Sequence, residues 1–425
     1  MKKLLVLPFL ILLLPIQVRE RGTAADGRIS SAVTVMTAPE SVQALSEYLQ
    51  TIQDRGQSRD DQGVLLETLD DGQSLASHNA DVTFNPASVM KLATSLVALA
   101  KLKPDYRYRT NILADGEIDF GSRTLEGDLV IEGGADPMFS SYDAQEVAVQ
   151  LSRLGIARVI GNLRIAGPFY YFATGYHSNL SPETSASKLR VAFQRAGIRI
   201  DGSTVFGEKA GTLLLSHYSD PLVSILLYQN AHSSNAIAEV VGTSLGGPKA
   251  IQDYLVKKCD LSESEIFVGR TSGLDFNRIT PRASLKILRA LIEVLADYSL
   301  QPEAVMAVAG VDSGTLIRRL GSDNVRGAVV AKTGTLVSMD NGVSTLVGIA
   351  YTRTHGPVLF ALFNSGGNVN AYRRLQDQFI ERLIAEEGGA LSARRNVDAL
   401  ADTTRQSIVQ VLYKEGHGVS ETAAE

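Results

Sequence analysis

Three short groups of residues in this chain have the side chains and spacing that acyl transfer through a serine requires. The first is Ser88-Val89-Met90-Lys91, in which a hydroxyl and an amine lie three residues apart. On a helix these two side chains share a face and can meet. A buried lysine binds its proton less tightly, and the neutral amine can then accept the proton of a serine hydroxyl. We therefore predict that Ser88 is a nucleophile and that Lys91 is its general base.

The Ser-x-x-Lys spacing alone is weak, because it occurs a second time at residues 185–188. That match begins an amphipathic stretch beside Arg190 and Arg195, where we expect a solvated, charged lysine. The stretch from Val89 to Ala100 is apolar apart from three residues, which is typical of a buried helix. This difference in surroundings favours Ser88.

The second group is Ser233-Ser234-Asn235, in a break between helices predicted at Leu222–Tyr228 and Ala236–Val241. A serine there can relay a proton, and the asparagine amide offers a donor and an acceptor to a substrate peptide bond. The alternative is an ordinary helix cap.

The third group is Lys332-Thr333-Gly334-Thr335, at the end of a strand predicted to start at Val325. A glycine on a strand lets a substrate backbone approach closely. The lysine and the two hydroxyls suit a carboxylate, and the N–H of Thr335 can complete an oxyanion hole. The alternative is a strand that ends in a polar hairpin.

Two further matches to catalytic patterns have unsuitable surroundings. Residues 322–324 read Ser-Asp-Asn but lie in a predicted turn that leads directly into a strand. Residues 242–246 read Gly-x-Ser-x-Gly, but that nucleophile elbow needs a strand before the serine, and here a helix precedes it.

The elements that must position these groups are a helix opened by Asn85-Pro86 and a set of strands. A strand is predicted at Val64–Thr68, with a hairpin turn at residues 70–72. Near the C-terminus three more strands follow, at Val325–Lys332, Ser344–Tyr351 and Val358–Phe363, before an amphipathic helix at Ala371–Glu387. Other helices are predicted at Glu40–Ile52, Ala144–Leu154 and Ala186–Ala196.

The domain organisation predicted from these elements has five parts. Residues 1–25 are predicted to be a signal peptide, because two lysines precede an apolar run that is short for a transmembrane helix. The alternative is an uncleaved N-terminal membrane anchor. Residues 26–108 and 216–388 form the domain that carries the three groups, residues 109–215 an inserted domain, and residues 389–425 a loosely attached polar tail. We expect an exported protein.

Composition excludes several function classes. The 41 lysines and arginines against 46 aspartates and glutamates give a net charge of −5, so binding to nucleic acid is not expected. Cys259 is the single cysteine, and the six histidines are scattered, so a zinc or iron–sulfur site is not expected either. Because nucleophile, base and oxyanion donors are all protein groups, no metal or organic cofactor is required.

The three groups occur in the order found in β-lactamases and penicillin-binding proteins. Over most of residues 60–385 the chain resembles the D-alanyl-D-alanine carboxypeptidase/endopeptidase family, the class C low-molecular-mass penicillin-binding proteins. Beyond the three groups, the resemblance rests on residues 85–92, 104–107, 127–137, 272–281 and 309–316. It departs from the family at Thr271 and Ala166, where the family usually has aspartate.

The resemblance implies a DD-peptidase-like α/β (α+β) fold, an antiparallel sheet flanked by helices, with a smaller inserted α/β domain. It implies that Ser88 is acylated, that Lys91 is the base and that Ser233 relays protons. It further implies that the remaining residues of the three groups bind the substrate, namely Asn235, Lys332, Thr333, Gly334 and Thr335.

The resemblance also implies peptidoglycan stem peptides as substrates and β-lactams as covalent inhibitors. The N-terminus offers a weak association with the membrane. Two alternatives are a β-lactamase or esterase on the same scaffold, and a catalytically inactive protein that binds the cell wall.

Overall fold

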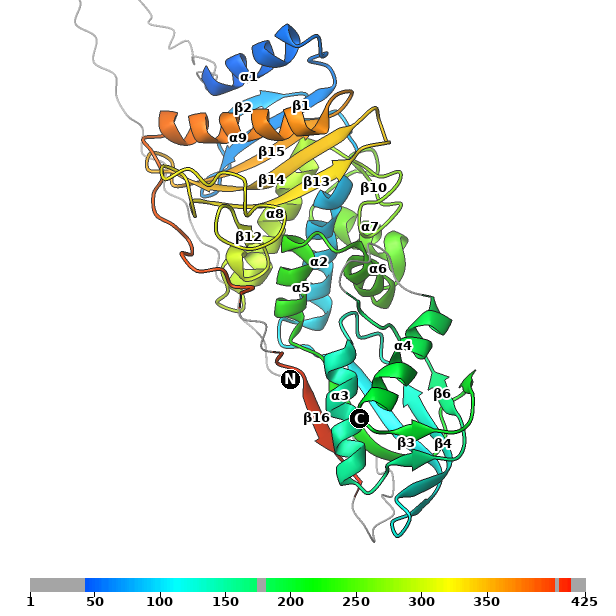
Figure 1. The fold of residues 1–425 in the computed structure, drawn as a ribbon. Coiled ribbons are helices and arrows are strands. Elements are labelled where there is room, and N and C mark those ends of the chain that lie inside the picture. The colour runs from blue at the N-terminus through cyan, green and yellow to red at the C-terminus, as the bar shows by residue number, and fades with distance from the viewer. Residues whose placement is uncertain (1–42, 174–180, 402–404, 414–425) are drawn as a thin grey trace, which may run out of the picture. The chain divides into compact units, whose positions relative to one another are not determined.

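A computed structural model describes residues 43–173, 181–401 and 405–413 of the chain. Its α-helices are α1 (Gln43–Asp54), α2 (Met90–Leu102), α3 (Ser141–Arg153), α4 (Pro182–Arg195), α5 (Leu222–Ala231), α6 (Asn235–Ser244), α7 (Gly247–Lys258), α8 (Pro281–Ala296) and α9 (Val369–Glu386). Short 3-10 helices are η1 (Ala87–Val89) and η2 (Pro302–Ala304). The arrangement of these elements is drawn in Figure 1.

The larger core lies around a six-stranded antiparallel sheet with the order β12-β13-β14-β15-β1-β2. These strands are β1 (Gln62–Thr68), β2 (Ser74–His78), β12 (Ala307–Val308), β13 (Val329–Leu336), β14 (Val343–Tyr351) and β15 (Pro357–Asn364). Strand β1 comes first in the chain and β15 comes last among these six strands, yet the two are neighbours in the sheet. Leu65, for example, pairs with Ala361.

Helices cover both faces of this sheet, with α1 and α9 on one face and α2 and α8 towards the other (Figure 1). Successive residues of a strand point to opposite faces. Accordingly Leu65 belongs to the core around α2 and α8, whereas Val64 and Leu66 belong to the core beneath α1 and α9. Every residue of β14 is buried, which explains why its sequence is apolar almost throughout.

A second sheet of mixed direction is built mainly from residues 109–218. Its main path is β16-β9-β3-β4-β5-β7, with β6 beside β4 and β8 beside β6. These strands are β3 (Arg109–Asp119), β4 (Thr124–Glu132), β5 (Arg158–Val159), β6 (Leu163–Ala166), β7 (Arg199–Ile200), β8 (Thr204–Phe206), β9 (Thr212–Tyr218) and β16 (Ile408–Val411). It has its own core, formed with α3 and α4. A separate pair, β10 (Ile266–Phe267) and β11 (Arg278–Ile279), completes the strands described.

The fold class predicted from the sequence is confirmed: an antiparallel sheet flanked by helices accompanies a smaller α/β part. The predicted strand borders near the C-terminus agree closely for β14 and β15, because both strands are predominantly apolar. The hairpin after Tyr351 also forms, with the Thr352 N–H donating to the carbonyl of Gly356 at 2.8 Å.

Three expectations differ from the structure. The strand expected at Val325–Lys332 instead runs over Val329–Leu336, so Lys332 lies in mid-strand and not at its end. The helix expected to begin at Asn85-Pro86 starts with the 3-10 turn η1, and α2 follows only from Met90. The first predicted helix extends to Asp54, and the start predicted for it at Glu40 lies outside the described residues.

The expectation of a loosely attached tail after residue 388 is wrong for its described part. Strand β16 pairs with β9, and Arg395 forms an ion pair with the buried Asp312 at 2.8 Å. Arg405 pairs with both Asp220 and Asp143, at 2.8 and 3.2 Å. Polar composition misled the prediction, because here the charged side chains bind buried carboxylates.

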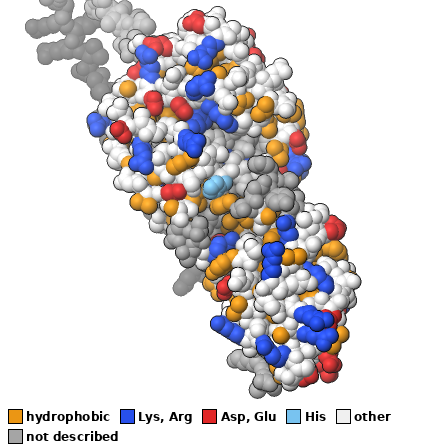
Figure 2. All heavy atoms as spheres, viewed as in Figure 1, with side chains coloured by type: hydrophobic (Ala, Val, Ile, Leu, Met, Phe, Trp, Pro, Cys, Tyr) orange, Lys and Arg blue, Asp and Glu red, His pale blue; other side chains and the backbone are white. Residues whose placement is uncertain are grey.

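The predicted signal peptide lies outside the described residues. Within the described ranges, no helix combines the length and apolar character needed to cross a bilayer. On the face drawn in Figure 2, acidic and basic side chains are interspersed, as suits a chain with a net charge of only −5.

Candidate active site

Ser88 lies in the 3-10 turn η1, and close backbone contacts fix this turn. The Asn85 side-chain oxygen accepts the N–H of Ala87 at 3.0 Å, so this cap does not compete for the N–H of Ser88. Ala87 has φ +47°, a left-handed conformation that a non-glycine residue adopts only when its surroundings enforce it. A Cβ on Gly273 would lie 1.8 Å from the Ala87 carbonyl oxygen, so only glycine permits this packing.

Lys91 lies on the first turn of α2 with its side chain fully buried. Its Nζ atom lies 2.9 Å from Ser88 Oγ, 2.7 Å from Asn235 Oδ1 and 2.6 Å from the carbonyl oxygen of Ser272. Burial, and then the nearby charge of Lys332, lower the pKa of Lys91 well below its usual value. Glu239 opposes this by raising the pKa.

These three contacts suit a neutral amine, which has two N–H groups and one lone pair. The two N–H groups can donate to the Asn235 and Ser272 oxygens, which have no proton to give in return. The lone pair then faces the Ser88 hydroxyl and can accept its proton.

The turn between α5 and α6 carries Ser233 in a strained conformation, with φ +56°. Ser234, and not Ser233, caps α6 by accepting the N–H of Ile237 at 3.3 Å. Ser233 is therefore left to face Lys332, whose Nζ donates to the Ser233 hydroxyl at 3.0 Å. Asn235, the first residue of α6, faces Lys91.

Strand β13 brings the third group against the serine turn. The Lys332 side chain is fully buried, and burial lowers its pKa to about 7. A Cβ on Gly334 would lie 2.1 Å from Thr345 Oγ1 and 2.6 Å from the carbonyl oxygen of Pro86. Glycine thus lets β13 pass directly beside the turn that carries Ser88.

The two threonines of the third group have partners that the sequence reasoning missed. Thr333 Oγ1 donates to Thr315 Oγ1 at 2.9 Å. Arg373, half-buried on α9, donates from Nη2 to Thr335 Oγ1 at 2.8 Å. No local pattern marks Arg373, because it meets Thr335 only through packing of α9 across the sheet.

Glu239 is a second missed residue, on α6. It accepts the backbone N–H of Ser272 at 3.1 Å and also the Ser272 hydroxyl. It thereby holds the segment whose carbonyl faces Lys91. Thr271 turns away from the amine and donates to the carbonyl of Ala238 at 2.9 Å.

The predicted site residues therefore come together through two links. Lys91 connects the first group to Asn235, and Lys332 connects the second group to the third. The other pattern matches lie elsewhere: residues 242–246 span the end of α6 and its connection to α7, and residues 322–324 form a turn. Ser185 and Lys188 lie on α4, which packs in the core of the second sheet.

The fold, together with the buried Lys91 amine at the start of α2 and the serine beside it in η1, is that of the serine DD-peptidases. The chain belongs to the D-Ala-D-Ala carboxypeptidase 3 (S13) family, whose sequence profile matches residues 42–170 and 179–386.

Individual relatives are distant in sequence. A D-alanyl-D-alanine carboxypeptidase from Actinomadura is 32% identical over 101 residues, which cover 24% of this chain and 18% of that protein. The carboxypeptidase DacB of Haemophilus influenzae is 25% identical over 101 residues, covering 24% of this chain and 21% of that protein. The aligned part thus spans about a fifth of these curated relatives.

Among solved structures, a predatory peptidoglycan endopeptidase from Bdellovibrio bacteriovorus superposes with a TM-score of 0.67 at 22% identity, over 80% of this chain and 95% of that one. This likeness shows that the two chains share a fold.

Proposed function

We propose that the protein is a serine-type D-Ala-D-Ala carboxypeptidase and endopeptidase that cleaves peptidoglycan stem peptides through an acyl-enzyme. The observation that carries the proposal is the 2.9 Å contact between the buried Lys91 amine and the Ser88 hydroxyl. Membership of the family supports the substrate class.

In the proposed first step, Ser88 Oγ attacks the carbonyl carbon of the penultimate D-alanine while its proton passes to Lys91 Nζ. The tetrahedral intermediate then expels the terminal amine, which receives a proton by way of Ser233. Water subsequently attacks the ester carbonyl, one of its protons restores the Ser88 hydroxyl, and the shortened peptide leaves as a carboxylic acid. The backbone N–H groups of Ser88 and Thr335 are proposed to bind the developing oxyanion.

Substrate recognition is assigned to the second and third groups. Asn235 would hold the substrate amide, and the hydroxyls of Thr333 and Thr335 would bind the terminal carboxylate beside Gly334. Lys332, when charged, would attract that carboxylate. Arg373 adds a second cation to this end of the site, because its guanidinium already reaches Thr335.

β-Lactams present a carbonyl and a carboxylate to the same groups, so we propose that they acylate Ser88. The Bdellovibrio endopeptidase has been obtained acylated by penicillin G. The test is labelling by a fluorescent penicillin: the wild type should be labelled and Ser88→Ala should not. An unlabelled wild type would overturn the enzymatic proposal and favour a protein that only binds the cell wall.

Turnover then separates the remaining functions. Mass spectrometry of purified peptidoglycan fragments should show loss of one D-alanine, cleavage of cross-linked dimers, or both. Rapid, repeated hydrolysis of a chromogenic β-lactam with no cleavage of the fragments would instead indicate a β-lactamase or esterase.

We also propose that residues 1–25 direct export and give at most a weak membrane association. The proposed domain borders remain those predicted from the sequence: 26–108 with 216–388, the insertion 109–215, and the tail 389–425.

A further inference from the structure

The carboxylate of Glu239 is linked to the Lys91 amine through a single intervening residue, Ser272. Glu239 lies on α6, which packs beside α2 (Figure 1). Its Oε1 atom accepts the backbone N–H of Ser272 at 3.1 Å and also the Ser272 hydroxyl. The carbonyl oxygen of the same serine accepts from Lys91 Nζ at 2.6 Å. Glu239 therefore holds the residue that supplies one of the acceptors for the amine.

The peptide bond between Thr271 and Ser272 is held from both sides. Thr94, one turn after Lys91 on α2, donates from its hydroxyl to the Thr271 carbonyl at 2.7 Å. The N–H of the same peptide bond donates to Glu239. With both polar groups of this peptide bond engaged, its plane cannot rotate freely. The direction of the next carbonyl, that of Ser272, is thereby set.

Glu239 is surrounded by hydrogen-bond donors on both of its oxygens. Arg270 lies 3.3 Å from Oε1, and the Thr271 hydroxyl lies 3.2 Å from Oε2. The glutamate side chain is only 20% exposed. These contacts favour an ionised carboxylate, because hydrogen bonds and a cation both stabilise the charged form.

The same carboxylate acts on the Lys91 amine through its charge. Burial is the largest influence on the pKa of Lys91 and lowers it, and the charge of Lys332 on β13 lowers it further. Glu239 acts in the opposite direction and raises this pKa. On the outer side, Arg270 pairs with Glu239, and Asp275 lies 3.6 Å from Arg270. Removing the charge of Glu239 should therefore lower the pKa of Lys91.

We propose that Glu239 is a positioning residue for the general base. It fixes the Ser272 carbonyl so that this carbonyl and the Asn235 oxygen take the two N–H groups of the neutral amine. The lone pair of Lys91 is then left to face the Ser88 hydroxyl. This inference rests on the proposed function, in which Lys91 accepts the proton of Ser88.

The variant Glu239→Gln separates the charge from the hydrogen bonds. The glutamine amide oxygen can replace Oε1, which accepts both groups of Ser272, and its NH₂ group can replace Oε2. That NH₂ group can donate to the Thr271 hydroxyl, which keeps its own donation to the carbonyl of Ala238. The variant therefore retains the geometry and loses the negative charge.

The measurement is the rate of acylation by benzylpenicillin below about pH 7, where Lys332 keeps its charge. In the wild type this rate should rise with pH towards a plateau as Lys91 loses its proton. In Glu239→Gln the rise should move to lower pH by roughly one unit, the effect of removing a nearby opposite charge. Arg270→Gln removes the cation beside Glu239 and should move the rise to higher pH, by less because this arginine is 47% exposed.

Glu265→Gln is the matched control. Glu265 accepts the backbone N–H and the hydroxyl of Ser262 at 2.8 and 3.1 Å, as Glu239 does with Ser272. It also lies 3.6 Å from a cation, Lys286, and its side chain is 23% exposed. Because Glu265 holds Ser262 and not the segment that contacts the amine, this variant should keep the wild-type pH dependence.

Glu239→Ala removes the hydrogen bonds together with the charge. We expect its plateau rate to fall roughly tenfold to a hundredfold, because the Ser272 carbonyl can then turn away from the amine. Glutamine at the same position should restore the plateau. If the alanine variant does not fold, the opposite pH shifts of Glu239→Gln and Arg270→Gln still decide the matter.

Three results would overturn the inference: a pH dependence of Glu239→Gln that coincides with the wild type, a plateau that glutamine lowers as much as alanine does, or an equal shift in Glu265→Gln. Each of these differs from failure of the proposed function. A wild type that benzylpenicillin does not acylate loses the reaction, and the role of Glu239 with it. A wild type that is acylated, with no shift in Glu239→Gln, keeps Ser88 and Lys91 in their assigned roles.

Discussion

At the scale of single residues, the site depends on two buried lysines with different tasks. In the proposed mechanism Lys91 is neutral when it accepts the proton of Ser88, whereas Lys332 is charged when it attracts a carboxylate. Burial lowers the pKa of both, and the charge of Lys332 lowers that of Lys91 further. The charge of Lys332 therefore favours the neutral state of the Lys91 amine.

The charge of Lys332 predicts a pH dependence that differs between substrates. Because burial sets its pKa at about 7, Lys332 loses its charge as the pH rises above that value. The kcat/KM for a peptide or thioester with a terminal carboxylate should therefore fall above about pH 7. A matched thioester without the carboxylate should show no such fall. An identical alkaline decline for both substrates would contradict the role of Lys332.

The same lysine makes stability depend on pH. Between about pH 7 and the ordinary value of 10.5, the unfolded chain binds more protons at this residue than the folded chain does, so the free energy of unfolding rises with pH. Over the whole window the gain is on the order of 5 kcal/mol. Urea denaturation of Lys332→Met should show greater stability than the wild type at pH 7, with the difference shrinking by pH 10. A constant difference would count against burial as the cause.

At the scale of elements, the site requires β13 to pass very close to the turn that carries Ser88. Gly334 permits this approach, and the Thr345 hydroxyl fixes it by donating to the carbonyl of Pro86 at 2.8 Å. Gly273 permits the corresponding approach on the other side of the turn. The serine turn is thus held by backbone contacts from two segments distant in sequence.

Substituting Gly334 by alanine should separate these elements. Its Cβ would overlap the backbone of Pro86 and the Thr345 hydroxyl, so β13 or the turn must shift. We expect Gly334→Ala to cost roughly 1–3 kcal/mol of stability and to slow acylation by benzylpenicillin at least tenfold. Gly356→Ala, at a glycine with open space in the distant hairpin, is the control and should retain normal acylation. Normal acylation of Gly334→Ala would show that the close approach is dispensable.

Local pattern was enough to predict most elements and to select three groups that the structure brings close together. Strands β14 and β15 are predominantly apolar, and the apolar surroundings of Lys91 distinguished it from Lys188. The 3-10 turn at Ser88 could not be predicted, because it depends on packing against Gly273 and Gly334. Arg373 and Glu239 were missed for a related reason: they reach the site from α9 and α6 through tertiary contacts that leave no mark in the neighbouring sequence.

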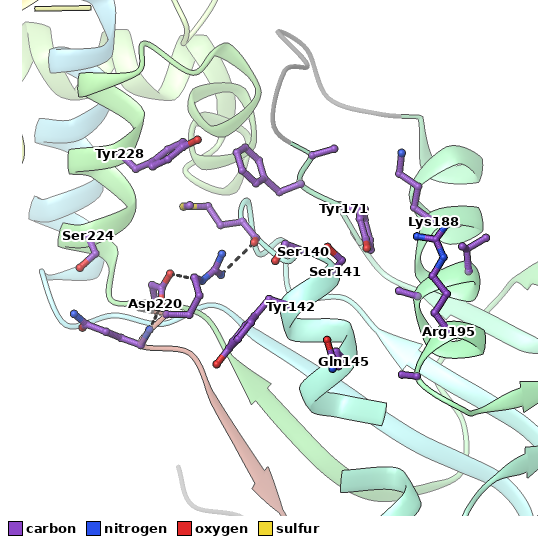
Figure 3. A pocket seen from close by; sticks show the side chains of 18 of the residues that line it. Ser140, Ser141, Tyr142, Gln145, Tyr171, Lys188, Arg195, Asp220, Ser224 and Tyr228 are labelled. Atoms are coloured by element: carbon purple, nitrogen blue, oxygen red, sulfur yellow. Dashed lines mark hydrogen bonds and ion pairs between the residues drawn. The ribbon is translucent and has the colours of Figure 1, made fainter. Parts of the chain in front are cut away.

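At the scale of the whole molecule, the C-terminal segment joins the two sheets. It runs past α5 and adds β16 to the second sheet, and Arg405 pairs there with Asp143 and Asp220. Burial would raise the pKa of Asp143, but a hydrogen bond with His217 and the charge of Arg405 hold it at about 2. Described residues of this segment also line a cleft beside α3, α4 and α5 (Figure 3).

Removing Arg405 should therefore leave two buried carboxylates without their cation. We expect Arg405→Gln to lower the free energy of unfolding by about 3 kcal/mol, within the range seen when one partner of a buried pair is lost. Arg158→Gln removes an ion pair with Asp201 whose arginine is 49% exposed, and it should cost less than about 1 kcal/mol. Equal effects of the two substitutions in urea denaturation would show that the segment contributes little to stability.

The role of Lys91 as the base for Ser88 is tested by the rate at which benzylpenicillin acylates the protein, followed by intact-protein mass spectrometry. The wild type should gain the mass of one benzylpenicillin, and below about pH 7, where Lys332 keeps its charge, the rate should rise with pH as the Lys91 amine loses its proton. Lys91→Met should be acylated roughly 10²–10⁴-fold more slowly, the usual contribution of a general base, and Ser88→Ala should gain no mass. Acylation of Lys91→Met at the wild-type rate would contradict the account, because the proton of Ser88 would then have another acceptor.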